Sequence, residues 1–279
     1  MKLYTIETGR FKLDGGAMFG VVPKSIWQKS NPADENNLCT WAMRCLLIED
    51  GNRLILIDTG IGNKQDERFF SHYYLEKDKT LEKSLQMHGF NKNDITDVFL
   101  THLHFDHCGG SVERKGDQLL AAFPKAIYWS NEPHWKWATQ PNDREKASFL
   151  RENILPIQES GQLKFLPVRD GHLFSKNFSV RFVHGHTQAM MLPQIKFKGH
   201  TLLYCADLFP SLGHLPLPYI MVYDMFPLIT LQEKKEFLEE ALLKKYILFF
   251  EHDPLTECCL LEQTDRGIRA SERFNLEEC

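Results

Sequence analysis

The stretch DVFLTHLHFDHCGG, residues 97–110, constrains the fold of this chain more than any other part of its sequence. After Asp97 comes the apolar run Val98, Phe99 and Leu100, which is typical of a buried strand. Three histidines and an aspartate follow directly on this run: His102, His104, Asp106 and His107. Buried imidazole and carboxylate groups are tolerated only when they are paired, so the fold must supply partners at the end of this strand.

The spacing of these four side chains predicts a metal site. In an extended segment His102 and His104 point to the same side, because side chains alternate with a period of two. They can therefore bind one ion, and zinc, manganese and iron all accept imidazole and carboxylate ligands. Asp106 and His107 follow where the glycines allow the chain to turn, so they can reach a second ion close by. Two ions roughly 3.5–4 Å apart are a common hydrolytic arrangement.

The composition is that of an ordinary globular protein and excludes several functional classes. The chain has 279 residues, 43% of them hydrophobic and 25% charged, with a net charge of −4. We expect a single domain over residues 1–279, no membrane partner and no nucleic-acid partner, because neither a membrane-spanning run nor a basic face is visible. The N-terminal segment lacks a signal-peptide core, and the seven cysteines fit no disulfide framework. A cytoplasmic location is expected, and a homodimer stays open.

Strand-like and amphipathic segments alternate along the chain. We predict strands over residues 2–8, 17–22, 44–50, 53–58, 97–101, 126–130, 163–168, 178–185, 191–199, 201–207, 246–253 and 258–264. We predict helices over residues 64–75, 80–88, 131–138, 144–154 and 230–246. In the last helix, Thr230 is the expected N-cap and Glu233 stands at capping-box spacing. Many strands in each half indicate two sheets packed face to face and covered by helices.

The segment THLHFDHCGG resembles the signature of the metallo-β-lactamase-fold hydrolases. That family combines the signature with an aspartate at an early strand end, a later histidine in a GHT-like turn, a further aspartate and a last histidine. The chain has Asp58 in LIDTGIG, His186 in HGHTQAM, Asp207 in YCADLFP and His252 in FFEHDP, in the family's order. The resemblance implies an α+β fold, a four-layer αβ/βα sandwich with the metals at one sheet edge.

The same resemblance implies a ligand set for two divalent ions. It assigns the first ion to His102, His104 and His186. It assigns the second ion to Asp106, His107 and His252, with Asp207 bridging. Asp58 would orient the loop that carries the histidines. His184 stands two residues before His186, so spacing alone cannot choose between them, and the family's GHT turn favours His186.

The expected reaction is hydrolysis of an ester-like bond. A metal-bridging water would lose its proton near neutral pH, and the resulting hydroxide would attack the substrate. Asp106 would be the catalytic residue that steers this nucleophile and receives its proton. Zinc is the expected metal, with manganese or iron as alternatives.

The ligand spacings are similar to those of the N-acyl homoserine lactonases and of the methyl-parathion type of phosphotriester hydrolase. We therefore expect a small-molecule substrate with an apolar acyl or aryl group, because an apolar pocket with few charges suits such groups better than nucleotides. Candidate substrate-contacting residues are Met18, Phe19, Phe105 and Phe209, each of which could equally be a core residue. The lactonases place a tyrosine three residues after the bridging aspartate, where this chain has Pro210.

A lactone or a carboxylic ester is the expected substrate, and two alternatives stay open. The first is a phosphotriester or phosphodiester hydrolase. The second is an iron-dependent oxidoreductase of the persulfide dioxygenase type, which uses only the ligands of the first ion. The full second set in this chain, Asp106 with His107 and His252, argues for two ions.

Overall fold

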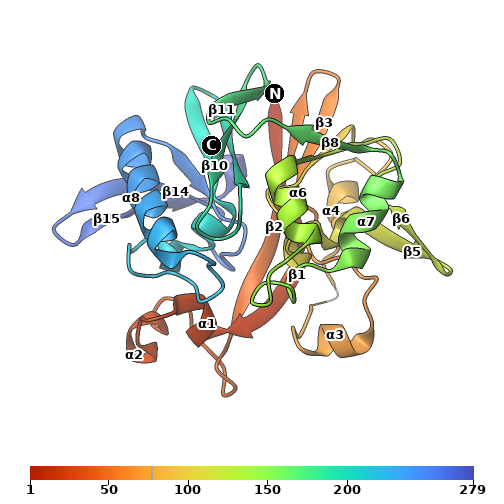
Figure 1. Ribbon diagram of the computed structural model, residues 1–279. Helices are drawn as coiled ribbons and strands as arrows, with labels where there is room; N and C mark the ends of the chain where they lie inside the picture. The colour runs from red at the N-terminus through yellow and green to blue at the C-terminus, as the bar shows by residue number, and fades with distance from the viewer. Residues whose placement is uncertain (77) are drawn as a thin grey trace. The chain divides into compact units, whose positions relative to one another are not determined.

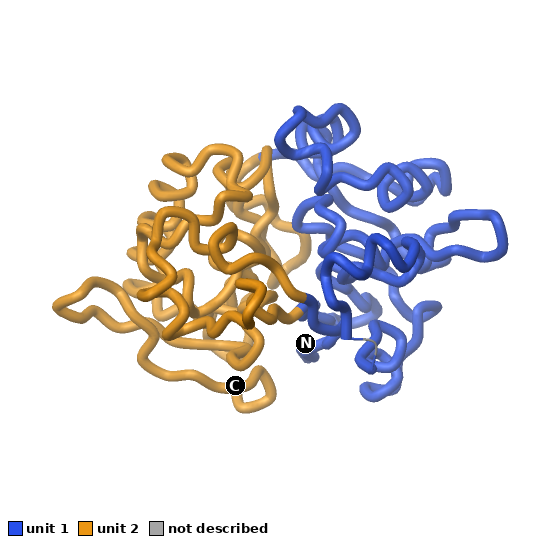
Figure 2. The backbone as a smooth tube through the Cα atoms, turned by 90° about the horizontal axis from the view of Figure 1, so that it is seen from below, with its two compact units in different colours: residues 1–11, 43–168 blue, residues 12–42, 169–279 orange. Residues whose placement is uncertain are grey.

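The computed structural model describes residues 1–76 and 78–279, and its internal contacts divide the chain into two compact units. Unit 1 comprises residues 1–11 and 43–168, and unit 2 comprises residues 12–42 and 169–279, as the colours of Figure 2 show. Strands β1 (Lys2–Asp14) and β2 (Leu38–Asp50) each run from one unit into the other. The single domain over residues 1–279 stays a prediction.

Unit 1 is built on a mixed sheet with the strand order β1-β2-β3-β4-β7-β8. The further strands of this sheet are β3 (Arg53–Ile57), β4 (Asp97–Phe99), β7 (Ile127–Asn131) and β8 (Leu163–Leu166). The pair β2–β3 is antiparallel, whereas β3, β4, β7 and β8 run parallel to one another. A separate antiparallel hairpin consists of β5 (Val112–Lys115) and β6 (Gln118–Ala121).

Helices cover the sheet of unit 1 and enclose an apolar core. They are α3 (Glu67–Ser71), α4 (Leu81–Met87), α5 (Phe105–Cys108), α6 (Glu132–Thr139) and α7 (Arg151–Glu159), with a 3-10 turn η1 (Gly109–Ser111). Val98 of β4 and Leu103 belong to the same buried cluster as Ile154 and Ile157 of α7. Strands buried in this way need apolar side chains on both faces, which explains the apolar run before the histidines.

Two predicted helices of unit 1 are shorter than expected or displaced. The helix over residues 64–75 is reduced to α3, and the helix over residues 144–154 begins only at Arg151. The Asn142 side chain accepts hydrogen bonds from the backbone N–H groups of Arg144 and Glu145, at 2.9 and 3.1 Å. This side chain therefore favours a turn where the amphipathic pattern indicated a helix.

Unit 2 is built on a sheet with the strand order β15-β14-β13-β12-β11-β10-β9. The strands are β9 (His172–Ser175), β10 (Phe178–Val183), β11 (Met190–Phe197), β12 (His200–Tyr204), β13 (Ile247–Phe249), β14 (Cys258–Thr264) and β15 (Gly267–Phe274). Neighbouring strands are antiparallel except for the pair β12–β13, which is parallel. Most of these strands match the predicted ones, because their alternating apolar residues fill the core.

The main helix of unit 2 is α8 (Pro227–Lys244), which packs against β14 and β15 (Figure 1). Its predicted start at Thr230 was wrong, because Pro227 occupies the first turn, where its missing N–H costs nothing. Glu233 therefore caps no helix, and its carboxylate accepts from the backbone N–H groups of His184 and Gly185. Among the described residues, no helix is both long and apolar enough to cross a bilayer.

The shorter helices of unit 2 include one that corrects a sequence-based expectation. They are α1 (Gly15–Phe19), α2 (Lys24–Trp27) and the 3-10 turns η2 (Ala206–Leu208), η3 (Leu212–His214) and η4 (Leu276–Glu278). The predicted strand over residues 17–22 is wrong, because the Asp14 side chain accepts from the Ala17 N–H and caps α1. A Cβ on Gly15 would lie 2.3 Å from the Trp27 ring, so this close packing requires glycine.

Candidate metal centre

In unit 1 the parallel arrangement of β3 and β4 gathers five polar side chains at one sheet edge. Asp58 directly follows β3, and His102 and His104 follow β4, while Asp106 and His107 lie in α5. The carboxyl ends of neighbouring parallel strands meet at the same edge, so the topology brings these residues together. All five side chains are buried. They are referred to below as the unit 1 cluster.

The hydrogen bonds around His102 and His104 determine which ring nitrogens can bind a cation. The Thr101 hydroxyl donates to Asp58 Oδ2 at 2.6 Å, so its oxygen accepts from His102 Nδ1 at 3.1 Å. His104 Nε2 donates to Glu145 Oε1 at 2.9 Å. His102 is then protonated on Nδ1 and His104 on Nε2. The remaining nitrogens, His102 Nε2 and His104 Nδ1, are both acceptors and lie 3.1 Å apart.

Two acceptor nitrogens that face each other repel unless a cation or a proton lies near them. A divalent metal ion satisfies both lone pairs at once, which is the usual reason for such an arrangement of imidazoles. The donor set of His102 and His104 therefore fits a metal ion. This confirms the sequence-based expectation that the two side chains point to the same side.

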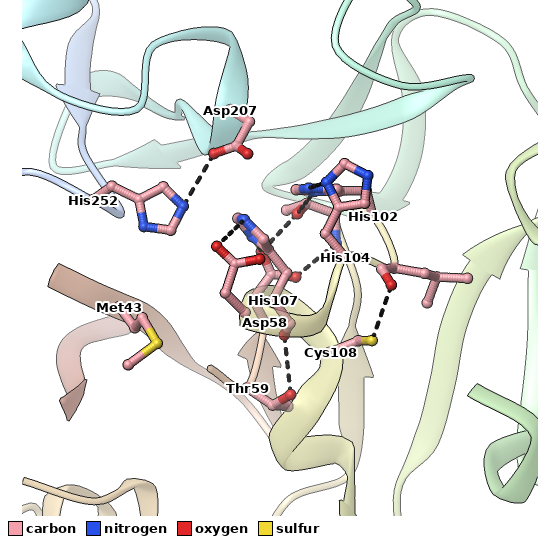
Figure 3. Close-up of polar contacts among 12 residues, drawn as sticks. Met43, Asp58, Thr59, His102, His104, His107, Cys108, Asp207 and His252 are labelled. Carbon is pink, nitrogen blue, oxygen red and sulfur yellow. Dashed lines mark hydrogen bonds and ion pairs between the residues drawn. The ribbon is translucent and has the colours of Figure 1, made fainter. Parts of the chain in front are cut away.

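Asp58 and His107 form the second part of the unit 1 cluster (Figure 3). His107 Nδ1 lies 3.2 Å from Asp58 Oδ2, and the same carboxylate accepts from the backbone N–H of Thr101 at 2.8 Å. His107 thus donates from Nδ1, and its Nε2 faces Asp106 Oδ2 at 3.8 Å. Asp58 thus contacts Thr101, which precedes the histidine motif, and His107, which ends it. Its role in orienting the loop stays a prediction.

In unit 2 three further side chains are gathered at one edge of the sheet. His186 follows β10, Asp207 lies in η2 after β12, and His252 follows β13. Strands β12 and β13 are parallel neighbours, and β10 runs in the same direction because two antiparallel pairings separate it from β12. The three carboxyl ends therefore lie at the same sheet edge. These three residues are the unit 2 cluster, and all of them are buried.

Each oxygen of the Asp207 carboxylate faces a different imidazole. His186 Nε2 lies 3.0 Å from Asp207 Oδ2, and His252 Nε2 lies 3.1 Å from Asp207 Oδ1 (Figure 3 shows the latter pair). His186 Nδ1 bonds Asp224 Oδ1 at 2.8 Å, and His252 Nδ1 donates to the carbonyl of Ala42 at 2.8 Å. Because the Nδ1 atoms of both histidines are hydrogen-bonded to other groups, both Nε2 atoms face the Asp207 carboxylate that lies between them.

The carboxylates of the unit 2 cluster favour a positive charge at His186. Burial opposes a charge on His186, yet the carboxylates of Asp207 and Asp224 raise its pKa to about 10. A proton therefore occupies this position when no metal ion is bound. A divalent ion that displaces the proton would satisfy the same acceptors, so the residues fit a metal.

Three residues that hold the clusters in place were not found by sequence reasoning. Glu145, completely buried, orients His104, and Thr101 links His102 to Asp58. Asp224 orients His186 from the loop before α8. None of these three has a local sequence pattern that marks it, because each depends on a partner at least 38 positions away: His104 for Glu145, Asp58 for Thr101 and His186 for Asp224.

The structure also separates the residues between which the sequence could not choose. His186 contacts Asp207, whereas His184 is half-buried and its Nδ1 accepts from the Ala189 N–H at 3.3 Å. Cys108 donates its thiol hydrogen to the Leu103 carbonyl and is fully buried, in agreement with a packing role. Pro210 accepts at its carbonyl from the His252 N–H at 3.0 Å, so it helps to hold the loop of that histidine.

The four candidate substrate residues are buried side chains. Phe19 is stacked on the rings of Trp27 and His214, at centroid distances of 5.2 and 4.5 Å. Met18 and Phe209 are also buried in unit 2. Phe105 packs edge-on against Phe69 in unit 1, at 5.5 Å. Their contact with a substrate stays a prediction.

Comparison with known proteins identifies the family. The model of the metallo-beta-lactamase superfamily matches residues 44–252, which is more than half of the chain. The chain belongs to the metallo-beta-lactamase superfamily. The metallo-β-lactamase fold and the α+β class predicted from the histidine signature are thereby confirmed.

Relatives of this superfamily member include lactonases and a metal-dependent hydrolase. The N-acyl homoserine lactonase AiiA of Bacillus thuringiensis subsp. kurstaki is 28% identical over 120 residues, which are 39% of this chain and 44% of that protein. The chain thus spans less than half the length of the curated relatives it matches.

Solved structures resemble the chain over nearly its whole length. A probable metal-dependent hydrolase from Staphylococcus aureus has a TM-score of 0.89 and 26% identity, with 99% of this chain and 97% of that chain covered. The dizinc quorum-quenching lactonase AidC, solved with a product, has a TM-score of 0.78 and 25% identity, with coverages of 98% and 95%. The family and these relatives support a hydrolase activity and the binding of divalent metal ions.

Proposed function

We propose that this superfamily member is a dinuclear metal hydrolase that cleaves an ester-like bond, with a lactone or a carboxylic ester as the substrate. The observation that carries the proposal is the position of Asp207, each of whose oxygens faces the Nε2 atom of a different histidine. A carboxylate in this arrangement is suited to share two cations, one on each oxygen.

The proposed ligand set follows from the ring nitrogens that point inward. His102 Nε2, His104 Nδ1 and His186 Nε2 would hold the first ion. Asp106, His107 Nε2 and His252 Nε2 would hold the second, with Asp207 between the two. Every one of these histidines has its other nitrogen bonded to a protein group, which fixes both its tautomer and its orientation.

In this proposal the protein positions water and substrate and moves one proton. When bound, the two ions acidify water and polarise the oxygen of the ester carbonyl. The Asp106 carboxylate lies in the first turn of α5, where it can orient the attacking water and accept its proton at Oδ. Asp58 keeps Nδ1 of His107 protonated, so that Nε2 remains a ligand.

The substrate class that we propose takes account of Pro210, which stands where the related lactonases have a tyrosine. The side chain at this position carries no hydroxyl that could polarise a substrate carbonyl, and the residue serves to hold the backbone of His252. We therefore propose esters and lactones as a class, and do not single out the acyl homoserine lactones of the related enzymes. Zinc is the proposed metal, because imidazole and carboxylate ligands in tetrahedral or five-coordinate sites suit it.

The proposal is tested with a panel of lactones, aryl esters, thioesters and phosphotriesters on zinc-loaded and manganese-loaded protein. We expect two metal ions per chain and turnover of at least one lactone or carboxylic ester. Turnover of phosphotriesters alone would move the assignment to phosphotriester hydrolysis. Iron in the purified protein together with persulfide oxidation would replace the hydrolase proposal by an oxidoreductase.

Two variants with a matched control test the ligands directly. His102→Ala and His107→Ala should each lower the bound metal by about one ion per chain and reduce turnover by more than the roughly 10- to 100-fold that the loss of a ligand-orienting residue costs. His184→Ala is the control, because its ring lies two positions from His186 and contacts no ligand in unit 2. Equal metal content in all three variants would reject the ligand set.

A further inference from the structure

Unit 2 contains a cavity of about 530 Å³ whose walls come from three segments. One wall is the loop of residues 215–219, which follows η3. The second wall is one side of α8, and the third is the hairpin formed by β14 and β15. Its volume lies within the range of about 300–1,000 Å³ that small-molecule pockets occupy. None of its lining residues belongs to the two metal-binding clusters.

The loop wall of this cavity is held in a fixed position by a buried ammonium group. Lys234 of α8 donates to the carbonyls of His214, Pro216 and Tyr219, at 2.7, 3.1 and 2.6 Å. The side chain is only 1% exposed, so its three donors are all used within the protein. A wall fixed by three charge-assisted hydrogen bonds makes the cavity a preformed one.

The lining of the cavity combines apolar side chains with charged groups, of which Lys235, Glu239 and Arg266 are exposed to solvent. Leu217, Leu238 and Ile268 contribute branched apolar side chains, one from each wall. Lys235, Arg266 and Arg269 contribute positive charges, against the single carboxylate of Glu239.

These three cations are available to a ligand. Within the described part of the chain, no ion pair joins Lys235, Arg266 or Arg269 to an acidic side chain. Arg269 makes one hydrogen bond, from Nη1 to the carbonyl of Ile268 at 2.8 Å, which leaves most of its donors for other partners. Arginine forks of this kind suit a planar carboxylate.

We propose that this cavity is a binding site for an amphiphilic carboxylate, with its alkyl chain against Leu217, Leu238 and Ile268 and its carboxylate at Arg266 and Arg269. The positive charge of the lining favours an anion, and the apolar walls favour a ligand with an alkyl chain. The site is separate from the proposed metal centre, and its occupation does not depend on the hydrolase proposal.

The test is calorimetric titration of the full-length, metal-loaded protein with decanoate, and in parallel with 1-decanol as the uncharged analogue. Decanoate should bind saturably with one ligand per chain at this site, and at least about 10-fold more tightly than 1-decanol, the scale of a charge-assisted pair. The double variant Arg266→Glu with Arg269→Glu should lose this preference. Lys176→Glu, an exposed charge change in the turn between β9 and β10, should retain it.

A second variant tests the same cavity in case the charge changes disturb the β14–β15 hairpin. Leu217→Trp fills the cavity without changing charge, and it should abolish decanoate binding while the circular dichroism spectrum and the thermal midpoint stay close to those of the parent chain. Decanoate binding that is unchanged in both cavity variants would overturn the proposal, because the ligand would then occupy the metal centre or another surface. Absence of saturable binding to the parent protein would overturn it as well.

Discussion

Glu145 Oε1 lies 2.9 Å from His104 Nε2, and both side chains are buried. This contact fixes which nitrogen of His104 carries the proton, and it turns the other nitrogen toward His102. The carboxylate also accepts from Trp137 Nε1 and, at 3.4 Å, from Asn142 Nδ2, and these bonds hold it in one orientation. A residue 41 positions away in the sequence thus determines how the histidine motif can bind metal.

Glu145→Gln should weaken metal binding while leaving the ligands in place. The amide oxygen can still accept from His104, but it carries no charge and makes the imidazole a poorer donor to a cation. We expect zinc affinity to fall about 10- to 100-fold, measured by competition with a chelator. Asp143→Asn is the control, because Asp143 is exposed and, among the described residues, pairs only with Lys146. Equal affinities of the Glu145 and Asp143 variants would show that His104 does not depend on this contact.

Asp58→Asn should lower both the stability and the metal affinity of the protein. Asp58 is fully buried at a φ of 56°, a conformation that asparagine also tolerates, so the backbone need not change. Its carboxylate accepts from donors on Thr101 and His107, and an amide nitrogen would face one of them. The expected loss is about 2–4 kcal/mol in urea unfolding, the cost of a broken buried network. A variant as stable as the parent would mean that these bonds contribute little.

Lys64→Met should change how stability responds to alkaline pH. Lys64 is buried and donates to the carbonyl of Gly109, in the turn that follows His107, and burial lowers its pKa to about 8. Between about pH 8 and the ordinary lysine value, the unfolded chain holds a proton that the folded chain has released. Stability of the parent protein therefore rises with pH in this window through this group, and the variant should lack that rise.

The measurement is urea unfolding of both proteins from pH 7 to pH 10. Effects from other titrating groups cancel in the difference between parent and variant. A difference that stays constant with pH would show that Lys64 keeps its ordinary pKa in the folded protein.

Glu240→Gln should destabilise unit 2 at neutral pH and not in strong acid. Although burial works in the opposite direction, hydrogen bonds from Arg181, Lys244 and Tyr246 lower the pKa of Glu240 to about 2. The stabilisation is therefore present above the ordinary glutamate pKa of about 4.3 and is lost as the pH falls toward 2. We expect a difference of about 1–2 kcal/mol at pH 6 that shrinks steadily below pH 4.

The neighbouring exposed Glu236 provides the control for this experiment, because within the part of the chain that the structure describes its side chain accepts only from Gln232 on the same helix. Glu236→Gln should change stability by less than about 0.5 kcal/mol, as is usual for exposed pairs. If the two variants behave alike across the pH range, the contacts of Glu240 do not stabilise the folded state.

Much of the candidate site could be predicted because its residues follow strands. The apolar run before His102, the glycines after His107 and the histidine after β13 are all local patterns, and the alternation of side chains relates them to sheet edges. The same reasoning failed for residues 17–22 and for Thr230. There the local pattern was overridden by the Asp14 cap and by Pro227, which act only in the context of the folded neighbours.

The sequence by itself determined the family, the candidate ligand residues and their order along the chain, because these depend on residue identity and short-range periodicity. Only the tertiary structure decided which ring nitrogen each histidine presents. That choice depends on Glu145, Asp224 and the carbonyl of Ala42, which lie 38 to 210 positions from their histidines. Hydrogen bonds over such separations follow from strand order and loop packing, and no local pattern encodes them.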